Sequence, residues 1–350
     1  MAAPQQQAFA WGVYSATLGD QDPLLLAWCD VGNLAVWSAE VNNQAGSFKL
    51  SSGSLIVAGT WVGLTAIIWT DLDMWVANYI GFPLIYSFNR VAQNCGLIAP
   101  KAWGVLGNMV AWMGQYDFFV YEGGSVRPVP CTVRDYVFNT IDRGNVSSVH
   151  CDVNTAGNEI MWRFPQGHLS GGVCTAYVKW SPAENSWDFG EGPPNLSAWA
   201  DISGWHYQDG GSYPLGIDYS GNILVFETDY DFPLSTVDIF YITGWFYIAE
   251  GQEMVTVERV NPDFVFNPEQ GFVTPSSGAV NMTFYFADEI PATETDYPVR
   301  TYGPYLVTDQ TPYIIVRGRG RVMQIRVDVV QGSFFRNGKH MARISIDGHR

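Results

Sequence analysis

The sequence predicts an all-β protein in which a β-propeller is followed by a C-terminal β-sandwich-like domain. The chain is 15% aromatic and only 15% charged, and it contains 36 Gly and 19 Pro. Few charges, many aromatic rings and abundant turn formers are typical of short strands rather than of long amphipathic helices. A recurring hairpin pattern then indicates which all-β architecture to expect.

This pattern runs from residue 24 to about residue 228: an apolar run, a turn rich in Gly, Asn or Asp, and a second run that ends in aromatic residues. It recurs every 25 to 45 residues or so, close to the length of a four-stranded propeller blade. Short strands joined by short turns indicate antiparallel hairpins. A propeller, complete or incomplete, is favoured because radial blades leave only short edges, and a β-sandwich with many hairpins is the alternative. The predicted turns lie at residues 30–33, 71–73, 107–108, 115–117, 154–158, 181–185 and 219–222.

One segment imitates a membrane span, because "SLIVAGTWVGLTAIIW" at residues 54–69 has no charged side chain. It is shorter than the roughly 18 to 20 residues that a spanning helix needs. Two buried strands joined near Trp61 to Gly63 explain the segment better. We therefore expect no membrane span.

The pattern changes after residue 235, where longer alternating strands are predicted within residues 238–266, 280–289 and 312–330. In "VMQIRVDVV" (322–330), Met323, Ile325 and Val327 alternate with polar residues, which indicates one core-facing side. We predict propeller-like blades over residues 1–235 and a sandwich-like interaction domain over residues 236–350, with the boundary near "FPLSTVD" at 232–238.

The formal net charge is −16, which disfavours affinity for nucleic acid through counterion release. The charge is unevenly distributed. Residues 300–350 carry nine basic and three acidic side chains, or +6, whereas residues 1–299 carry nine basic and 31 acidic ones, or −22. Opposite charges of this kind suit subunits that stack or form rings.

The five cysteines are odd in number and scattered, without a CxxC or Cys/His cluster. This pattern predicts free thiols of a protein made in a reducing cytoplasm rather than disulfides or a zinc site. No phosphate loop, dinucleotide fingerprint, GxSxG or HExxH motif is present. The sequence therefore predicts no cofactor, no metal and no enzyme activity, and the start "MAAPQQQAFAWG" predicts no secretory leader.

Three potential catalytic or binding sites have simpler structural explanations. Cys95 could be a nucleophile, but no histidine lies near it in the sequence, so a packed thiol is favoured. Asp71 and Asp73 could be paired carboxylates, but as turn residues they cap a hairpin. Asp201 and His206 lie in a polar aromatic loop that could bind sugar by stacking, which remains the less favoured interpretation.

The arginines of "VRGRGR" have period two, so on a strand they would share one face. An acidic partner strand or a neighbouring subunit would neutralise them there, with phosphate contact or simple solvation as alternatives. We predict inter-subunit contacts for Arg317, Arg319 and Arg321.

A second group of residues is predicted to fill the wedge between blades. Large rings in the glycine-punctuated run at residues 102–124 would each contribute roughly 2 to 3 kcal/mol when buried. The predicted inter-blade residues are Trp103, Trp112, Phe118 and Tyr121.

A series of distinctive phrases runs along nearly the whole chain. They include "NNQAGSFKLSSGSLIVAG" (42–59), "IIWTDLDMWVANYIG" (67–81), "NCGLIAPKAW" (94–103), "NEIMWRFP" (158–165), "LGIDYSGNILVFE" (215–227) and "TYGPYLVT" (301–308). In their order, these phrases resemble the β-propeller tail hub and nozzle proteins of short-tailed double-stranded-DNA phages, including packaged-DNA stabilisation proteins. Many relatives are longer, so the resemblance leaves open whether the propeller closes within this chain.

The resemblance implies a structural virion protein that forms a ring, expected to be a hexamer, in the tail. The ring would contact other tail proteins such as the adaptor, nozzle or fibres, and genomic DNA would pass through it without specific binding. The resemblance carries over no catalytic residue. The alternative function is a virion propeller that recognises or degrades a host polysaccharide, and a soluble cellular scaffold propeller is a third possibility that lacks a blade consensus.

Overall fold

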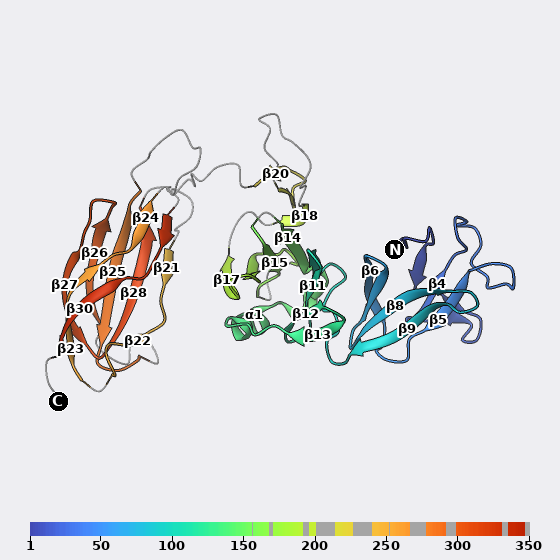
Figure 1. Ribbon diagram of the computed structural model, residues 1–350, viewed down its shortest axis with the longest axis horizontal. Coiled ribbons are helices and arrows are strands. Elements are labelled where there is room, and N and C mark those ends of the chain that lie inside the picture. Colours follow the sequence, from blue (N-terminus) through green and yellow to red (C-terminus); the bar gives the residue numbers. More distant parts are fainter. Residues whose placement is uncertain are drawn as a thin grey trace. The chain divides into compact units, whose positions relative to one another are not determined.

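The computed structural model describes residues 1–155, 157–167, 171–191, 196–200, 214–226, 240–251, 253–266, 278–291, 299–330 and 335–346. The chain divides into two compact units, Met1–Glu227 and Thr228–Arg350, here called unit 1 and unit 2 (Figure 1). The boundary predicted at residues 232–238 lies outside the described residues. Both units are built from strands, so the prediction of an all-β protein is confirmed.

Three four-stranded sheets dominate unit 1, and in each the strands follow one another antiparallel in chain order. This up-and-down arrangement is that of propeller blades, and the turns predicted at residues 71–73, 107–108 and 181–185 join the observed strands. The first sheet, here sheet E, contains β6 (Ile56–Val62), β7 (Thr65–Thr70), β8 (Met74–Gly81) and β9 (Ile85–Ala92). Sheet G contains β10 (Trp103–Leu106), β11 (Met109–Met113), β12 (Phe118–Glu122) and β13 (Ser125–Pro128). Sheet F contains β14 (His150–Asn154), β15 (Glu159–Phe164), β16 (Ala176–Ser181) and β17 (Ser186–Glu191).

Shorter elements complete the described part of unit 1. A helix and a 3₁₀ turn lie between sheets G and F in the sequence, α1 (Arg134–Thr140) and Arg143–Ser148. The N-terminal sheet contains β1 (Phe9–Trp11), β4 (Leu25–Trp28) and β5 (Gly46–Lys49), beside the two-residue pair β2 (Tyr14–Ser15) and β3 (Asp20–Gln21). The last sheet contains β18 (Leu196–Ala200), β19 (Leu215–Asp218) and β20 (Ile223–Val225).

The charge-free segment at residues 54–69 forms β6 and β7, as predicted, with Gly63 at the turn (φ +60°). Because side chains of a strand alternate, β7 contributes to two cores. Ile67 and Trp69 join the core shared by sheets E, G and F, whereas Ala66 and Ile68 join the core shared with the N-terminal sheet. Apolar side chains on both faces explain why the segment lacks charge. Within the described residues, no helix has the length and apolar character to cross a membrane.

One predicted strand is wrong. The hairpin expected at residues 24–37 has its first strand, β4, but residues 34–37 form none. β4 instead pairs with β1 and β5, which lie outside the predicted hairpin. Leu34 is 69% exposed, so the apolar run that suggested a strand does not pack into a core.

Unit 2 contains two main sheets that share one apolar core, which is a sandwich arrangement. Valines and phenylalanines of alternating strands fill this core, among them Val257, Phe284 and Val327. Sheet J contains β21 (Phe240–Ile242), β28 (Val322–Val329), β25 (Val280–Ala287) and β26 (Arg300–Val307), and β22 (Phe246–Tyr247) also pairs with β28. Sheet K contains β27 (Ile314–Gly320), β23 (Val255–Asn261) and β30 (Met341–Ile346), and β24 (Phe264–Phe266) pairs with β29 (Phe335–Asn337).

Candidate functional site

The two faces of sheet F differ sharply in character. One face joins the aromatic core that the sheet shares with sheet G. On the other face, the register of the strands brings together side chains that are mostly charged or polar, and we call this set the charged ladder. It consists of His150, Asp152, Glu159, Arg163, Lys179 and Asp188.

At one end of the ladder, a buried carboxylate has two basic neighbours. Asp152 Oδ2 accepts a hydrogen bond from Arg163 Nε at 2.6 Å, and His150 Nε2 lies 3.7 Å from Asp152 Oδ1. Cys174 Sγ lies 3.8 Å from His150 Nδ1 and donates to the carbonyl oxygen of Ser148 at 3.3 Å. The order thiol, imidazole, carboxylate is that of a nucleophilic triad.

The electrostatics of this group argue against a nucleophile. Burial raises the pKa of the Cys174 thiol, whereas reactive thiols have lowered pKa values and partial exposure. Burial also lowers the pKa of His150 and raises that of Asp152, in the latter case against the opposing effect of its basic neighbours. These pKa shifts fit a neutral His150 imidazole beside an Asp152 carboxylate that is held by Arg163. The contacts of this group join β14, β15 and the segment that contains Cys174.

The other end of the ladder is more open. Lys179 Nζ contacts Glu159 Oε1 at 3.0 Å and Asp188 Oδ2 at 3.8 Å. A cavity of about 50 Å³ lies beside these residues and is also lined by Trp199 of β18. It is large enough for water but not for an organic ligand.

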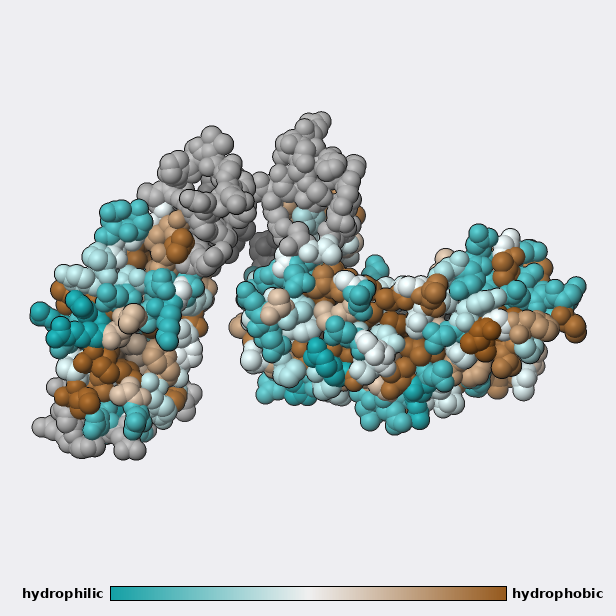
Figure 2. Space-filling model, in the orientation of Figure 1, coloured by the Kyte–Doolittle hydropathy of each residue, from teal (hydrophilic) through white to brown (hydrophobic). Residues whose placement is uncertain are grey.

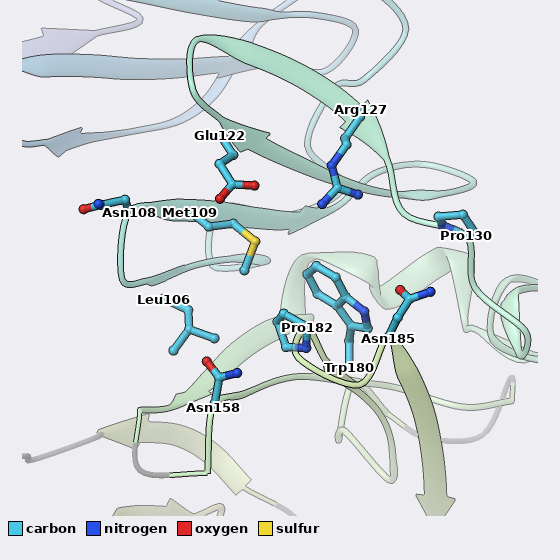
Figure 3. A pocket seen from close by; sticks show the side chains of 10 residues that line it. All are labelled: Leu106, Asn108, Met109, Glu122, Arg127, Pro130, Asn158, Trp180, Pro182 and Asn185. Atoms are coloured by element: carbon cyan, nitrogen blue, oxygen red, sulfur yellow. The ribbon is translucent and has the colours of Figure 1, made fainter.

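A larger hollow, of about 710 Å³, lies between sheets G and F at the ends of their hairpins. Figure 3 shows Glu122 and Arg127 on the β12–β13 side, facing Trp180 and Pro182 on the side of β16 and its turn. Three turn asparagines, Asn108, Asn158 and Asn185, complete the polar rim.

Of the arginines predicted to make inter-subunit contacts, Arg317 and Arg319 point outward from β27. They alternate with the buried Val316, Gly318 and Gly320. Arg321 is half-buried in the connection to β28. Two of the three arginines, Arg317 and Arg319, therefore share one face of the strand as predicted. Their contact with another subunit stays a prediction.

The aromatic residues predicted to fill the wedge between blades lie in the core of unit 1. Trp103 and Trp112 pack against Trp69 of sheet E, each with ring centroids 5.6 Å apart. Phe118 faces the other way and packs against Trp162 of sheet F at 4.9 Å. Tyr121 is partly buried against the same core.

The three weighed sites have different outcomes. Cys95 is buried, and burial raises the pKa of its thiol to about 12, so the packed thiol is what the structure shows. Asp71 and Asp73 lie at the turn between β7 and β8, and Asp71 accepts from the backbone N–H of Ser54 at 2.7 Å. Asp201 and His206 lie outside the described residues. Within the described part of the chain, no group of three or more His, Cys, Asp or Glu could hold a metal ion.

The charged ladder was missed by the sequence reasoning, although a signal existed. His150, Asp152 and Asn154 recur with period two in "HCDVN", and such alternation places them on one face of a strand. What the sequence did not reveal is that Cys174 and Arg163 come to the same place, because those contacts depend on strand pairing.

No protein-family model matches the sequence, and the search of curated proteins found no match. Two solved structures resemble part of it. The computationally designed protein Ika8 is 10% identical with a TM-score of 0.36, over 59% of this chain and 53% of that one, so the match spans about half of the designed protein. The WD40 domain of Pan2 from Neurospora crassa is 10% identical with a TM-score of 0.31, over 59% of this chain and 70% of that one. Likeness at this level carries no conclusion about function.

Proposed function

We propose that the chain is a structural virion protein of a phage tail that forms an oligomeric ring, a hub or nozzle, which extends and gates the genome channel. The observation that carries this proposal is the division of charge. The chain as a whole has a formal charge of −16. On the outer face of sheet K, however, the described residues include the exposed Arg259, Arg317, Arg319 and Arg343 beside one acid, Glu258.

A closed ring needs two different surfaces on each subunit that fit one another. A basic face on an acidic chain supplies such a pair, because the basic face of one copy attracts an acidic surface of the next. The ordered resemblance of the sequence phrases to tail hub and nozzle proteins points to the same assembly, with six copies in the ring.

The overall charge also suits a channel for DNA. Each contact between an Arg or Lys and a phosphate would hold the genome back, whereas a wall with acidic groups leaves it mobile. Residues 1–299 carry the excess of acidic side chains that such a wall requires.

The mass of the purified particle tests the proposal. We expect a particle of six times the 38.9 kDa chain mass by native mass spectrometry or analytical ultracentrifugation. A monomer at micromolar concentration would count against a ring, and so would a basic bore in the assembled particle.

A second candidate function, recognition of a host glycan, is favoured by the hollow between sheets G and F. The hollow is lined by groups that can bind a sugar. Its asparagine side chains, carboxylate and guanidinium can hydrogen-bond sugar hydroxyls, and its indole can stack on a sugar face. If this function is correct, the protein should bind or cleave host polysaccharide, and Glu122→Gln should abolish that activity while leaving the particle mass unchanged. Failure to bind the polysaccharide would leave the ring as the sole proposal.

A further inference from the structure

Strand β30 is an exposed sheet edge. It pairs with β23 on one side, and no described strand pairs with its other side. Five of its six residues are exposed. Among them, Met341, Ile344 and Ile346 are 70%, 41% and 61% exposed. Figure 2 shows hydrophobic residues gathered on the visible face of unit 2, over the region where Figure 1 labels β30 and β23.

Two other edges of unit 2, those of the seven-residue β27 and the eight-residue β26, carry features that discourage pairing. β27 has outward arginines and a bulge where Arg317 takes a positive φ of 53°, and charged residues and bulges are common protections of edge strands. β26 contains Pro304 and has an irregular register with β25 between Tyr302 and Tyr305. β30 has neither proline nor glycine, and Arg343 is its one charged residue. An unprotected apolar edge of six residues is a template for an added strand.

Unit 1 offers a strand of matching length and opposite charge. β17 (Ser186–Glu191) is also a sheet edge, bonded to β16 on one side. Asp188 and Phe189 are exposed on it, the carboxylate with a side chain 58% exposed and the ring 46% exposed. The other described edge strands of unit 1 with four or more residues do not offer an exposed acid. They are basic or uncharged, except for β14, whose one acid, Asp152, is buried.

We propose that β30 of one copy pairs with β17 of a second copy, which joins unit 2 of one subunit to unit 1 of the next. This inference rests on the proposed oligomer and names its contact. With the two strands parallel and fully overlapped, Arg343 lies beside Asp188 on one face and Ile344 lies beside Phe189 on the other. The pairing satisfies exposed backbone groups, covers apolar side chains and matches charge.

The experiment compares particle masses of the full-length protein and its variants by analytical ultracentrifugation over a concentration series. Arg343→Glu and Ile346→Glu should each weaken association at least tenfold, because in this register they place a carboxylate beside Asp188 and Glu191, respectively. Leu64→Lys is the matched control, since Leu64 is 71% exposed in the β6–β7 turn and belongs to neither edge strand, and it should leave the mass unchanged. Thermal melting verifies that each variant folds, a check that Arg343→Glu requires because Arg343 contacts Glu258 at 3.0 Å.

Charge reversal identifies the partner strand. Asp188→Arg alone should weaken association, and Asp188→Arg combined with Arg343→Glu should restore it. An oligomer that survives both Arg343→Glu and Ile346→Glu would overturn the β30 contact while leaving the proposed ring intact. If both β30 variants dissociate the oligomer, but Asp188→Arg combined with Arg343→Glu does not restore it, β17 is not the partner strand. A wild-type monomer would overturn the proposed ring itself, and the contact with it.

Discussion

At the scale of single residues, the core of unit 1 depends on rings rather than on thiols. Trp112 is fully buried, packs against Trp69 of the neighbouring sheet and donates its indole N–H to the carbonyl oxygen of Cys95 at 2.7 Å. Trp112→Ala should therefore cost about 3 to 5 kcal/mol of unfolding free energy through the cavity it leaves. Cys95→Ser, which buries a hydroxyl in place of a thiol, should cost only about 1 to 2 kcal/mol.

Urea denaturation followed by tryptophan fluorescence measures both changes. Trp103→Ala, at a partly buried ring of the same sheet, serves as the control and should have a smaller effect than Trp112→Ala. A larger loss for Cys95→Ser than for Trp112→Ala would contradict the view that the core depends on the ring rather than on the thiol.

The buried end of the charged ladder predicts a pH dependence of stability. Burial holds the pKa of His150 below its usual value of about 6.5, so the folded protein prefers the neutral ring. As the pH falls through 6.5, the unfolded chain takes up a proton that the folded chain does not, and stability is lost. The raised pKa of Asp152 acts in the opposite direction, with stability gained as the pH falls through that pKa.

Replacement of His150 separates the two effects. Between pH 7.5 and 5.5, wild type should lose about 1 kcal/mol more unfolding free energy than His150→Gln does. His340, whose pKa burial also lowers, is retained in both proteins and so does not affect the difference. Equal pH slopes in the two proteins would show that His150 is not held neutral by the fold.

At the scale of elements, one glycine sets how closely sheets G and F approach. A Cβ on Gly104 of β10 would lie 2.5 Å from Val153 Cγ2 and 2.8 Å from Cys151 Sγ, both on β14. Gly104→Ala should consequently cost about 1 to 3 kcal/mol, because the two sheets must separate. The double variant Gly104→Ala/Val153→Ala should recover part of that loss, and a denaturation double-mutant cycle measures the coupling. Additive losses would mean that Val153 is not what the added methyl group meets.

At the scale of the whole molecule, each unit has its own apolar core. The buried clusters of unit 1 lie within residues 3–180, and that of unit 2 lies within residues 248–327. Units with separate cores fold separately, so the fragment 228–350 should give the dispersed amide spectrum of a folded β protein. An unfolded fragment would show instead that unit 2 requires unit 1.

The whole-molecule charge predicts weak contact with DNA. At 0.15 M salt, we expect affinity for double-stranded DNA below that of non-specific DNA-binding proteins, whose Kd values are roughly 1 to 100 µM. Fluorescence anisotropy with a labelled duplex measures this. Tight binding that Arg317→Ala and Arg319→Ala remove would indicate that the arginine face of β27 contacts phosphate rather than protein.

The sequence by itself determined the features that depend on neighbours along the chain. A continuous uncharged apolar run predicted β7, and alternation predicted β25 and β28. Turn residues predicted the hairpins at residues 107–108 and 181–185, since side-chain pattern and turn chemistry are local properties. Tertiary structure decided what depends on distant partners. Residues 34–37 form no strand because β4 pairs elsewhere, Cys174 meets His150 because β14 lies beside its segment, and β30 is an edge because no described strand pairs with its outer side. Such pairings join residues far apart in the sequence, and their free energy depends on burial and register, which no local pattern encodes.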